Sequence, residues 1–279
     1  RPLYYDLAGR FPALDFYDAD IPLSLRFAAR YKVYPLGHFS IDENGAISAL
    51  DSPWELEPAS IPLRILQLRP NSDPAQRKPT HLEVTTSKRS FRLSLQPARL
   101  FLIGLRAILR KEDPDLILTD FGDTWLFPQI EQWRTENGTS FNPNRDEGMD
   151  VHTKPGSSYF SYGQVIYRGA QSHLFGRWHI DRKNAMLYSE YGLAGVLEQA
   201  RVTGLPVQEI ARKSPGSGIT AMQMLTALQT GVMVPVTKQQ AEGRKSLGEL
   251  IRADRGGLIY QPIIGTHHNV AQIDFASMY

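Results

Sequence analysis

The order of apolar patterns between residues 61 and 138 constrains the fold more than any other feature of this sequence. Three strand-like segments come first, and they are separated by turn-forming residues. They lie at 61–68, 80–86 and 89–95. Apolar residues then recur at helical spacing from 97 to 112, between Pro97 and the Asp113-Pro114 pair, which predicts a helix.

A buried strand at 116–120 and a helix over 124–138 continue the pattern, and Asn137-Gly138 is expected to end that helix. Strands first, then strands interleaved with helices, predict a β-rich beginning followed by an α/β domain. Further strands are expected at 31–41, on both sides of the Asn44-Gly45 turn, at 162–169, at 176–181 and in 256–279. Further helices are expected near 188–202, 206–213, 217–230 and 243–253, and residues 139–160 are expected to form a loop.

Composition excludes several classes of site. The 279 residues include no cysteine, so disulfides, zinc-thiolate sites and cysteine nucleophiles are excluded. No apolar run approaches the roughly 18 residues of a membrane span, so no membrane partner is expected. The net charge of +2 and the pI near 8.7 are compatible with a polyanionic partner without demanding one.

The last residues, "DFASMY", place one carboxylate, Asp274, directly after an apolar run. Metal-dependent phosphoryl transfer needs carboxylates that hold two divalent ions about 4 Å apart, and a strand end followed by free backbone amides can form half of such a site. The spacing alone is more typical of ordinary structure than of such a site. Its meaning depends on the rest of the chain.

These six residues resemble the A motif of the B-family DNA polymerases, and the resemblance extends upstream in family order. The stretch that begins "DRGGLIYQPIIG" is similar to the family's Gly-Gly linker, "GRWHID" to a Gly-Arg strand, and "ARKSPGSGI" to the segment before the palm. "DPDLILTDFGDTWLFPQI" resembles the second exonuclease motif region, and "DADIPLSLRFAARYKVYPLGHFSI" resembles the N-terminal domain.

The resemblance implies a layout of three parts. Residues 1–60 correspond to part of an N-terminal domain, 61–235 to a ribonuclease-H-like 3′–5′ exonuclease domain, and 236–279 to a linker and the first strand of the palm. The second carboxylate motif of the palm and the lysine-rich helix of the fingers are not in the sequence. We expect the remaining palm, the fingers and the thumb as partners, together with primer-template DNA and a deoxynucleoside triphosphate.

The family motifs also imply roles for single residues. Asp274 corresponds to a catalytic ligand of Mg²⁺, the cofactor of the complete polymerase. The residues next to it would meet the incoming nucleotide: Phe275, Ser277, Met278 and Tyr279. Arg255, Gly256 and Gly257 correspond to a linker that touches DNA, although Asp254 replaces a tyrosine that the family usually has nearby.

The exonuclease motifs depart from the family pattern at all three metal positions, which here are Arg69, Leu126 and Gly195. Two-metal chemistry needs three or four converging acids, so we expect a degenerate exonuclease, typical of a divergent prokaryotic branch. Asp120, Asp123 and Asp181 do not fall on the metal positions; we expect Asp181 to belong to a structural strand and Asp123 to cap a helix.

Other features fit two interpretations each. A group of basic residues could face DNA phosphates or form a solvated surface: 168, 177, 182, 183, 201, 212 and 213. Trp125, Trp133 and Trp178 are expected in the core rather than as stacking platforms. His267 and His268 are expected on opposite faces of a strand, which disfavours metal binding.

Two functions remain open from the sequence. The chain is either the N-terminal part of a DNA-directed DNA polymerase involved in replication or repair, inactive by itself, or a non-catalytic nucleic-acid-binding or scaffold module left after exonuclease decay. An active nuclease is disfavoured by the missing acids. A cytoplasmic, nucleoid-associated prokaryotic location is expected for the first.

Overall fold

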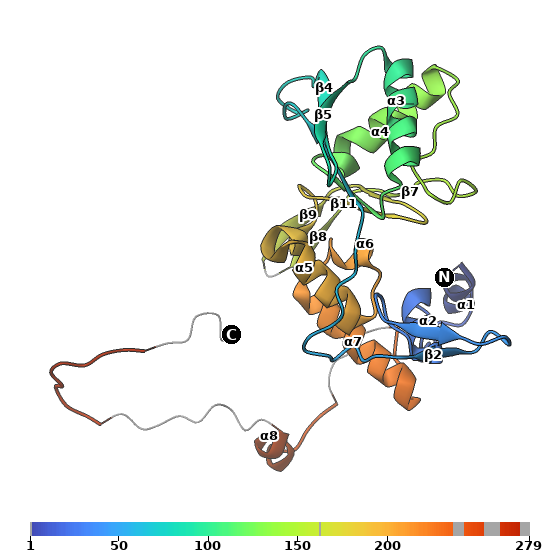
Figure 1. Cartoon of the computed structure of the whole chain (residues 1–279). Coiled ribbons are helices and arrows are strands. Elements are labelled where there is room, and N and C mark those ends of the chain that lie inside the picture. The colour runs from blue at the N-terminus through green and yellow to red at the C-terminus, as the bar shows by residue number, and fades with distance from the viewer. Residues whose placement is uncertain (1, 162, 237–242, 254–262, 274–279) are drawn as a thin grey trace. The chain divides into compact units, whose positions relative to one another are not determined.

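The computed structural model of the chain describes residues 2–161, 163–236, 243–253 and 263–273 (Figure 1). The chain divides into two compact units, Arg1–Val236 and Thr237–Tyr279. No helix in the described ranges is long and apolar enough to cross a membrane.

A five-stranded mixed sheet forms the centre of the first unit, in the order β11-β6-β3-β4-β5. Its strands are β3 (Ile65–Pro70), β4 (His81–Thr85), β5 (Ser90–Ser94), β6 (Leu116–Thr119) and β11 (Trp178–Asp181). The strands β3, β6 and β11 are parallel, whereas β4 pairs antiparallel with both β3 and β5. All five strands lie where the sequence predicts them.

Helices cover both faces of this sheet, which explains the fully buried β6. On one face, Leu66 and Leu68 pack with α3 (Ala98–Glu112) and α4 (Phe127–Glu136), which lie side by side in Figure 1. On the other face, Leu118 and Ile180 join a second core cluster with residues of α5 (Met186–Thr203), α6 (Val207–Ile210) and α7 (Pro215–Thr230).

The expected helix over 124–138 begins differently from a regular α-helix. Residues Gly122–Leu126 form one π-helical turn, η1, which continues directly into α4. Trp133 is buried, and Trp125 and Trp178 pack against the two core clusters, so the prediction that these tryptophans belong to the core is confirmed.

The predicted loop over 139–160 is wrong in its second half. Strand β7 (His152–Lys154) pairs with β10 (Gln171–His173), and β8 (Ser157–Ser161) forms a hairpin with β9 (Gln164–Arg168). Glycine, proline and serine in this stretch indicated a loop, but backbone pairing across the turn decides the outcome.

The β-rich character expected for residues 1–60 is also wrong. This stretch contains α1 (Pro2–Arg10), α2 (Leu23–Tyr31) and one short hairpin, β1 (Phe39–Ile41) with β2 (Ile47–Ala49), around the predicted Asn44-Gly45 turn. Ile21, Leu25 and Ala28 are buried, and α2 packs against α7. Their three- and four-residue spacing is helical, and α7 supplies the surface that stabilises a nine-residue helix.

The second unit contains α8 (Leu247–Ala253). Residues 263–273, which include His267 and His268, have no strand, so the strand prediction is wrong for that stretch. The predicted DNA contacts Arg255, Gly256 and Gly257 and the predicted palm residues 274–279 lie outside the described residues. The three-domain division also stays a prediction.

The packing of α3 leads to a first testable prediction. Leu105 is 1% exposed in the core, whereas Leu100 on the same helix is 61% exposed. Leu105→Ala should lower the free energy of unfolding by about 2–5 kcal/mol, because it leaves a cavity. Leu100→Ala, the matched control, should change it by less than about 0.5 kcal/mol. Urea unfolding measures both; equal effects would contradict this packing.

Candidate functional site

The carboxyl ends of the three parallel strands meet at one edge of the sheet. The register places Leu68 beside Thr119 and Thr119 beside Asp181. The next residue of each strand therefore continues a row across the sheet: Arg69, Asp120 and Arg182. The backbone pairing of the strands includes this row, because the Asp120 amide donates to the Leu68 carbonyl and the Arg182 amide donates to the Thr119 carbonyl.

In this row, one carboxylate lies between two guanidinium groups. Arg182 Nε donates to Asp120 Oδ1 at 2.8 Å, and Arg69 Nε lies 3.9 Å from Asp120 Oδ2. The three side chains line an open cavity of about 620 Å³, together with Asp73 and Lys183. Three cations against two carboxylates suit an anion better than a divalent cation.

The other two expected exonuclease positions do not line this cavity. Leu126 has no exposed surface and belongs to the apolar core between the sheet and α4. Gly195 lies on α5, and a Cβ atom added there would lie 2.3 Å from the Cβ of Tyr191. Of the three positions named from the sequence, only Arg69 faces the sheet edge.

Behind this edge lies a buried ion pair that the sequence did not reveal. Arg212 Nε donates to Asp123 Oδ2 at 2.9 Å, and Arg212 Nη2 donates to Oδ1 at 3.0 Å. Both side chains are at most 1% exposed. The Asp123 carboxylate also accepts hydrogen bonds from the Ser172 amide and from Asn184. The predicted helix-cap role of Asp123 is therefore wrong.

Asp181 has the capping role instead. Its carboxylate accepts hydrogen bonds from the amides of Phe121, Asp123 and Lys183 at 2.9–3.0 Å, so it binds the start of η1. The neighbouring His179 is fully buried. Its Nδ1 faces the Ser172 carbonyl at 2.7 Å, and this acceptor identifies Nδ1 as the protonated nitrogen of a neutral ring.

Burial and charge shift the acid–base properties of this network. Burial would raise the pKa of Asp123, but the charge of Arg212 and its hydrogen bonds outweigh burial and hold the pKa below its ordinary value. Burial raises the pKa of Asp181, and the charge of Asp123 adds to this. Burial, with the charge of Arg212 second, lowers the pKa of His179 to about 4.

Several of the basic residues named from the sequence are interior residues. Arg177, Arg201 and Arg212 are each at most 7% exposed. Arg201 binds Glu198 and the carbonyls of Pro53 and Glu55. The interpretation of these three as part of a solvated basic surface is therefore wrong. By contrast, Arg168 lines a cavity of about 270 Å³ that also includes Arg182 and Lys183.

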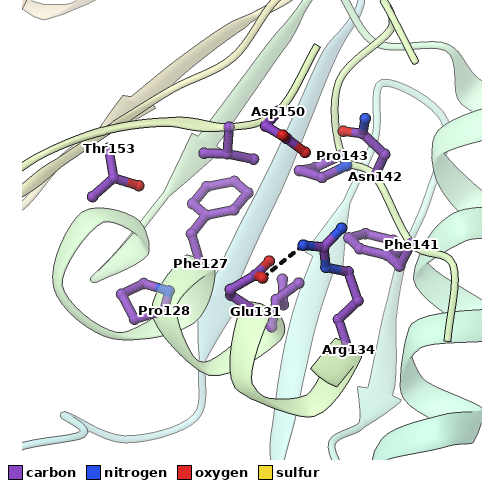
Figure 2. Close-up of a pocket in the computed structure, with 11 residues that line it drawn as sticks. Phe127, Pro128, Glu131, Arg134, Phe141, Asn142, Pro143, Asp150 and Thr153 are labelled. Atoms are coloured by element: carbon purple, nitrogen blue, oxygen red, sulfur yellow. Dashed lines mark hydrogen bonds and ion pairs between the residues drawn. The ribbon is translucent and has the colours of Figure 1, made fainter. Parts of the chain in front are cut away.

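A separate cavity of about 400 Å³ lies between α4 and the segment 141–153 (Figure 2). Its lining includes Phe127 and Phe141, and Arg134 binds Glu131 at 2.6 Å across its apolar floor. The cavity can accept a small apolar group beside this ion pair. Neither sequence patterns nor the family motifs pointed to it.

Within the described ranges, no three His, Asp or Glu side chains converge to hold a metal ion. The sequence indicates Arg182 only as one of the basic residues that could face DNA phosphates, and Asp120 only as an acid outside the metal positions. A signal for their meeting is present, since Asp120 ends one predicted strand, Arg182 follows another, and the carboxyl ends of parallel strands meet at one sheet edge.

Comparison with characterised proteins finds archaeal DNA polymerases. The chain is 32% identical over 85 residues to "DNA polymerase 2" of Saccharolobus solfataricus, covering 30% of this chain and 14% of that protein. It is 26% identical over 146 residues to "DNA polymerase" of Archaeoglobus fulgidus, covering 52% of this chain and 17% of that protein. "DNA polymerase 2" of Aeropyrum pernix is 29% identical over 99 residues, covering 36% and 11%. The chain thus matches less than a fifth of each relative's length.

The fold comparison agrees with the sequence comparison. The structure of the family B DNA polymerase from Pyrobaculum calidifontis superposes with a TM-score of 0.54 at 16% identity, covering 82% of this chain and 38% of that one. No family model matches the sequence. The predicted resemblance to family B DNA polymerases is therefore confirmed, in sequence by the curated relatives and in fold by the solved structure.

The neutral, buried His179 leads to a prediction about pH. An unfolded histidine takes up a proton near pH 6.5, whereas His179 resists this until about pH 4, so the unfolded state binds more protons between these values. Stability should therefore fall as the pH drops from about 6.5 to 4, by at most about 1.4 kcal/mol per pH unit from this group. His173, whose pKa burial lowers to about 3, adds a contribution of the same sign.

Urea unfolding at half-unit pH steps measures this slope. The His179→Gln variant should show a smaller slope of stability against pH between pH 6.5 and 4, even if it is less stable at every pH. His268→Gln, which changes an exposed imidazole, is the control and should keep the original slope. A slope unchanged in His179→Gln would contradict the buried neutral ring.

Proposed function

We propose that this chain is the N-terminal part of a DNA-directed DNA polymerase, in which it contacts DNA and supplies the first metal-binding aspartate of the palm. The similarity to archaeal DNA polymerases over up to 146 residues, together with a family B fold over 82% of the chain, supports the proposal. The polymerase activity, its substrates and its partners belong to the proposal, because the matches cover only part of each relative.

The sheet supports a ribonuclease-H-like interpretation of residues 61–235. Numbered along the chain, its strands lie in the order 3-2-1-4-5, with the second strand antiparallel and the first, fourth and fifth parallel. The cavity at the carboxyl ends of the parallel strands is where an open α/β sheet generally binds its ligand. We assign the degenerate exonuclease site to this cavity.

The contacts of Asp120 support an inactive exonuclease. Gln67 and Arg69 project from the same face of β3, toward the cavity side on which Asp120 lies paired with Arg182. Two guanidinium groups beside the one carboxylate of the row would repel Mg²⁺, at about 2 kcal/mol per cation at 4 Å even in a solvent-like dielectric. These residues do not fit a two-metal centre.

The same cations fit a different role, which is to bind the phosphates of a DNA strand. Arg69 is 63% exposed, and Arg182 and Lys183 line two neighbouring cavities. Exposed arginine and lysine side chains bind phosphate oxygens without reading base sequence. We propose that this edge holds single-stranded DNA weakly and without cutting it.

The palm assignment rests on the family motif alone. In the proposal, Asp274 binds Mg²⁺ in the complete polymerase. Phe275, Ser277, Met278 and Tyr279 would contact the incoming deoxynucleoside triphosphate, and Arg255, Gly256 and Gly257 would contact the primer-template. The second carboxylate motif, the fingers and the thumb would come from further polymerase sequence. A nucleoid-associated, cytoplasmic role in prokaryotic replication or repair completes the proposal.

The alternative is a non-catalytic nucleic-acid-binding or scaffold module. The ion-paired sheet edge favours it as much as it favours an inactive exonuclease inside a polymerase, because both retain the cationic cavity. The gene sequence after codon 279 separates the two. A second palm carboxylate motif and a lysine-rich fingers helix, in the same or a neighbouring gene, support the polymerase.

The exonuclease proposal predicts that the 279-residue chain does not degrade single-stranded DNA. A 5′-labelled oligonucleotide should keep its full length with Mg²⁺ or Mn²⁺, because Arg69, Leu126 and Gly195 offer no carboxylate. Shortening from the 3′ end that a chelator stops would contradict the proposal.

A triple variant, Arg69→Asp with Leu126→Asp and Gly195→Asp, tests whether acids alone restore cleavage. We expect no cleavage, because Leu126 is a core residue and a side chain at Gly195 meets Tyr191. Arg69→Asp alone changes only an exposed side chain and is the control for folding. Metal-dependent cleavage by the triple variant would show that the site geometry has survived.

The palm proposal predicts that the purified chain does not extend a primer. A single aspartate cannot hold two Mg²⁺ ions against water, since such ions need several oxygen ligands. A primer-extension gel with a preparation of Asp274→Ala controls for contaminating polymerase. Extension by the unchanged chain that exceeds this control would refute the prediction.

A further inference from the structure

A second cationic cavity lies at the opposite edge of the sheet from the Asp120 row. It has a volume of about 300 Å³ and is lined by residues near the C-terminal end of α3, by the segment 140–147 and by Arg177. Arg177 directly precedes β11, and Asp113 precedes β6. The four residues of β6, at about 3.3 Å each, separate the two edges by roughly 13 Å.

Arg177 is the unusual member of this cavity. Its side chain is 6% exposed, and it forms a long ion pair, with 3.5 Å between Nη2 and Asp113 Oδ1. Its Nε and Nη1 are buried and have no hydrogen-bond partner in the described part of the chain. Buried guanidinium nitrogens are ordinarily paired, because leaving a charged donor without an acceptor is costly. Burial and the nearby charge of Arg145 lower the pKa of Arg177, which agrees with an unfavourable position for its charge.

The neighbouring arginines differ in how far their donors are used. Arg145 is saturated, since it binds Asp113, Asp115 and the carbonyls of Pro114 and Gly176. Arg106 donates to one carbonyl, that of Ser140, at 3.2 Å, and Arg110 lies 3.5 Å from Glu147. Arg145 therefore maintains the structure, whereas Arg106, Arg110 and Arg177 keep donors available.

Charge decides which ligand fits. The lining contains four arginines against two carboxylates, Asp113 and Glu147. A divalent cation is excluded by this surplus, and a single carboxylate would neutralise only half of it. A phosphate dianion matches the surplus, and its tetrahedral oxygens accept the parallel N–H groups of guanidinium.

We propose that this cavity binds a phosphate group through Arg177, Arg106 and Arg110. The phosphate would belong either to free phosphate or a small phosphorylated molecule, or to the terminal phosphate of a nucleic acid, which carries two charges where a backbone phosphodiester carries one. The proposal does not depend on the polymerase assignment, because it rests on the unpaired nitrogens and on the charge of this cavity alone.

Thermal unfolding of the full 279-residue chain in phosphate, against chloride at matched ionic strength and pH, tests the proposal. Phosphate should raise the unfolding midpoint of the unchanged chain in a concentration-dependent way. Arg177→Met should lose this rise. In chloride it should unfold at the same temperature as the unchanged chain or higher, because it removes a buried charge that has two nitrogens without a partner. An arginine that only supports the fold would give the opposite result in chloride.

A second variant keeps the test valid if Arg177→Met does not fold. Arg106→Gln, on a half-buried position of α3, should weaken the calorimetric Kd for inorganic phosphate by about tenfold, the loss of one charge-assisted hydrogen bond. Arg99→Gln is the charge-matched control on the exposed face of the same helix and should leave this Kd unchanged.

Fluorescence anisotropy with a 3′-labelled, 5′-phosphorylated single-stranded oligonucleotide distinguishes the two sources of phosphate. If the cavity takes a nucleic-acid phosphate, Arg106→Gln weakens oligonucleotide binding more than Arg99→Gln does, and inorganic phosphate competes. If it takes free phosphate, oligonucleotide binding is equal in the two variants while the phosphate Kd still differs. The proposal is overturned if phosphate acts no differently from chloride, or if Arg177→Met and Arg106→Gln respond to phosphate as the unchanged chain does.

Discussion

The buried pair of Asp123 and Arg212 joins the segments on which the rest of the first unit depends. Asp123 is the second residue of η1, Ser172 belongs to β10, and Arg212 lies two residues beyond the end of α6. Each Asp123 oxygen and several Arg212 nitrogens have partners, which include the carbonyls of His179 and Gln208. A buried pair of this kind does not guarantee high stability, but the loss of one member leaves a charge without solvent or partner. The segments η1, β10, β11 and the residues after α6 are therefore constrained together.

This network also determines what the functional edge can do. The Asp181 carboxylate accepts hydrogen bonds from the amides at the start of η1, so it is not available at the surface. Asp120, one strand position further out on β6, is the carboxylate that remains, and Arg182 and Arg69 neutralise it. The edge consequently presents positive charge. With more acidic residues, such a strand end could hold cations. Here its positive charge suits it to anions.

Both edges of the sheet are cationic for different reasons. At the carboxyl edge, Arg69 is exposed and Arg182 is half-buried, and the two share one aspartate, which fits weak contact with a polyanion. At the amino edge, Arg177 is buried with two unpaired nitrogens, which fits a defined ligand of matching charge. The two edges differ in desolvation. A buried donor without a partner costs more free energy than an exposed donor, which can bind water.

The sequence by itself determined the central sheet, because alternation in 61–95 and helical spacing in 97–112 are local patterns that burial on one face enforces. It also determined that Arg69, Leu126 and Gly195 offer no carboxylate. It did not reveal α2, whose short apolar face is stabilised by α7 about 190 residues later, nor the pairing of β7 with β10. Only the tertiary structure decided that Asp123 pairs with Arg212, 89 positions away, and that Arg177 is buried without partners for two of its nitrogens. The charge and type of each residue can be read from the sequence. The burial of a side chain and the partners that it binds depend on contacts between segments that are distant in the sequence.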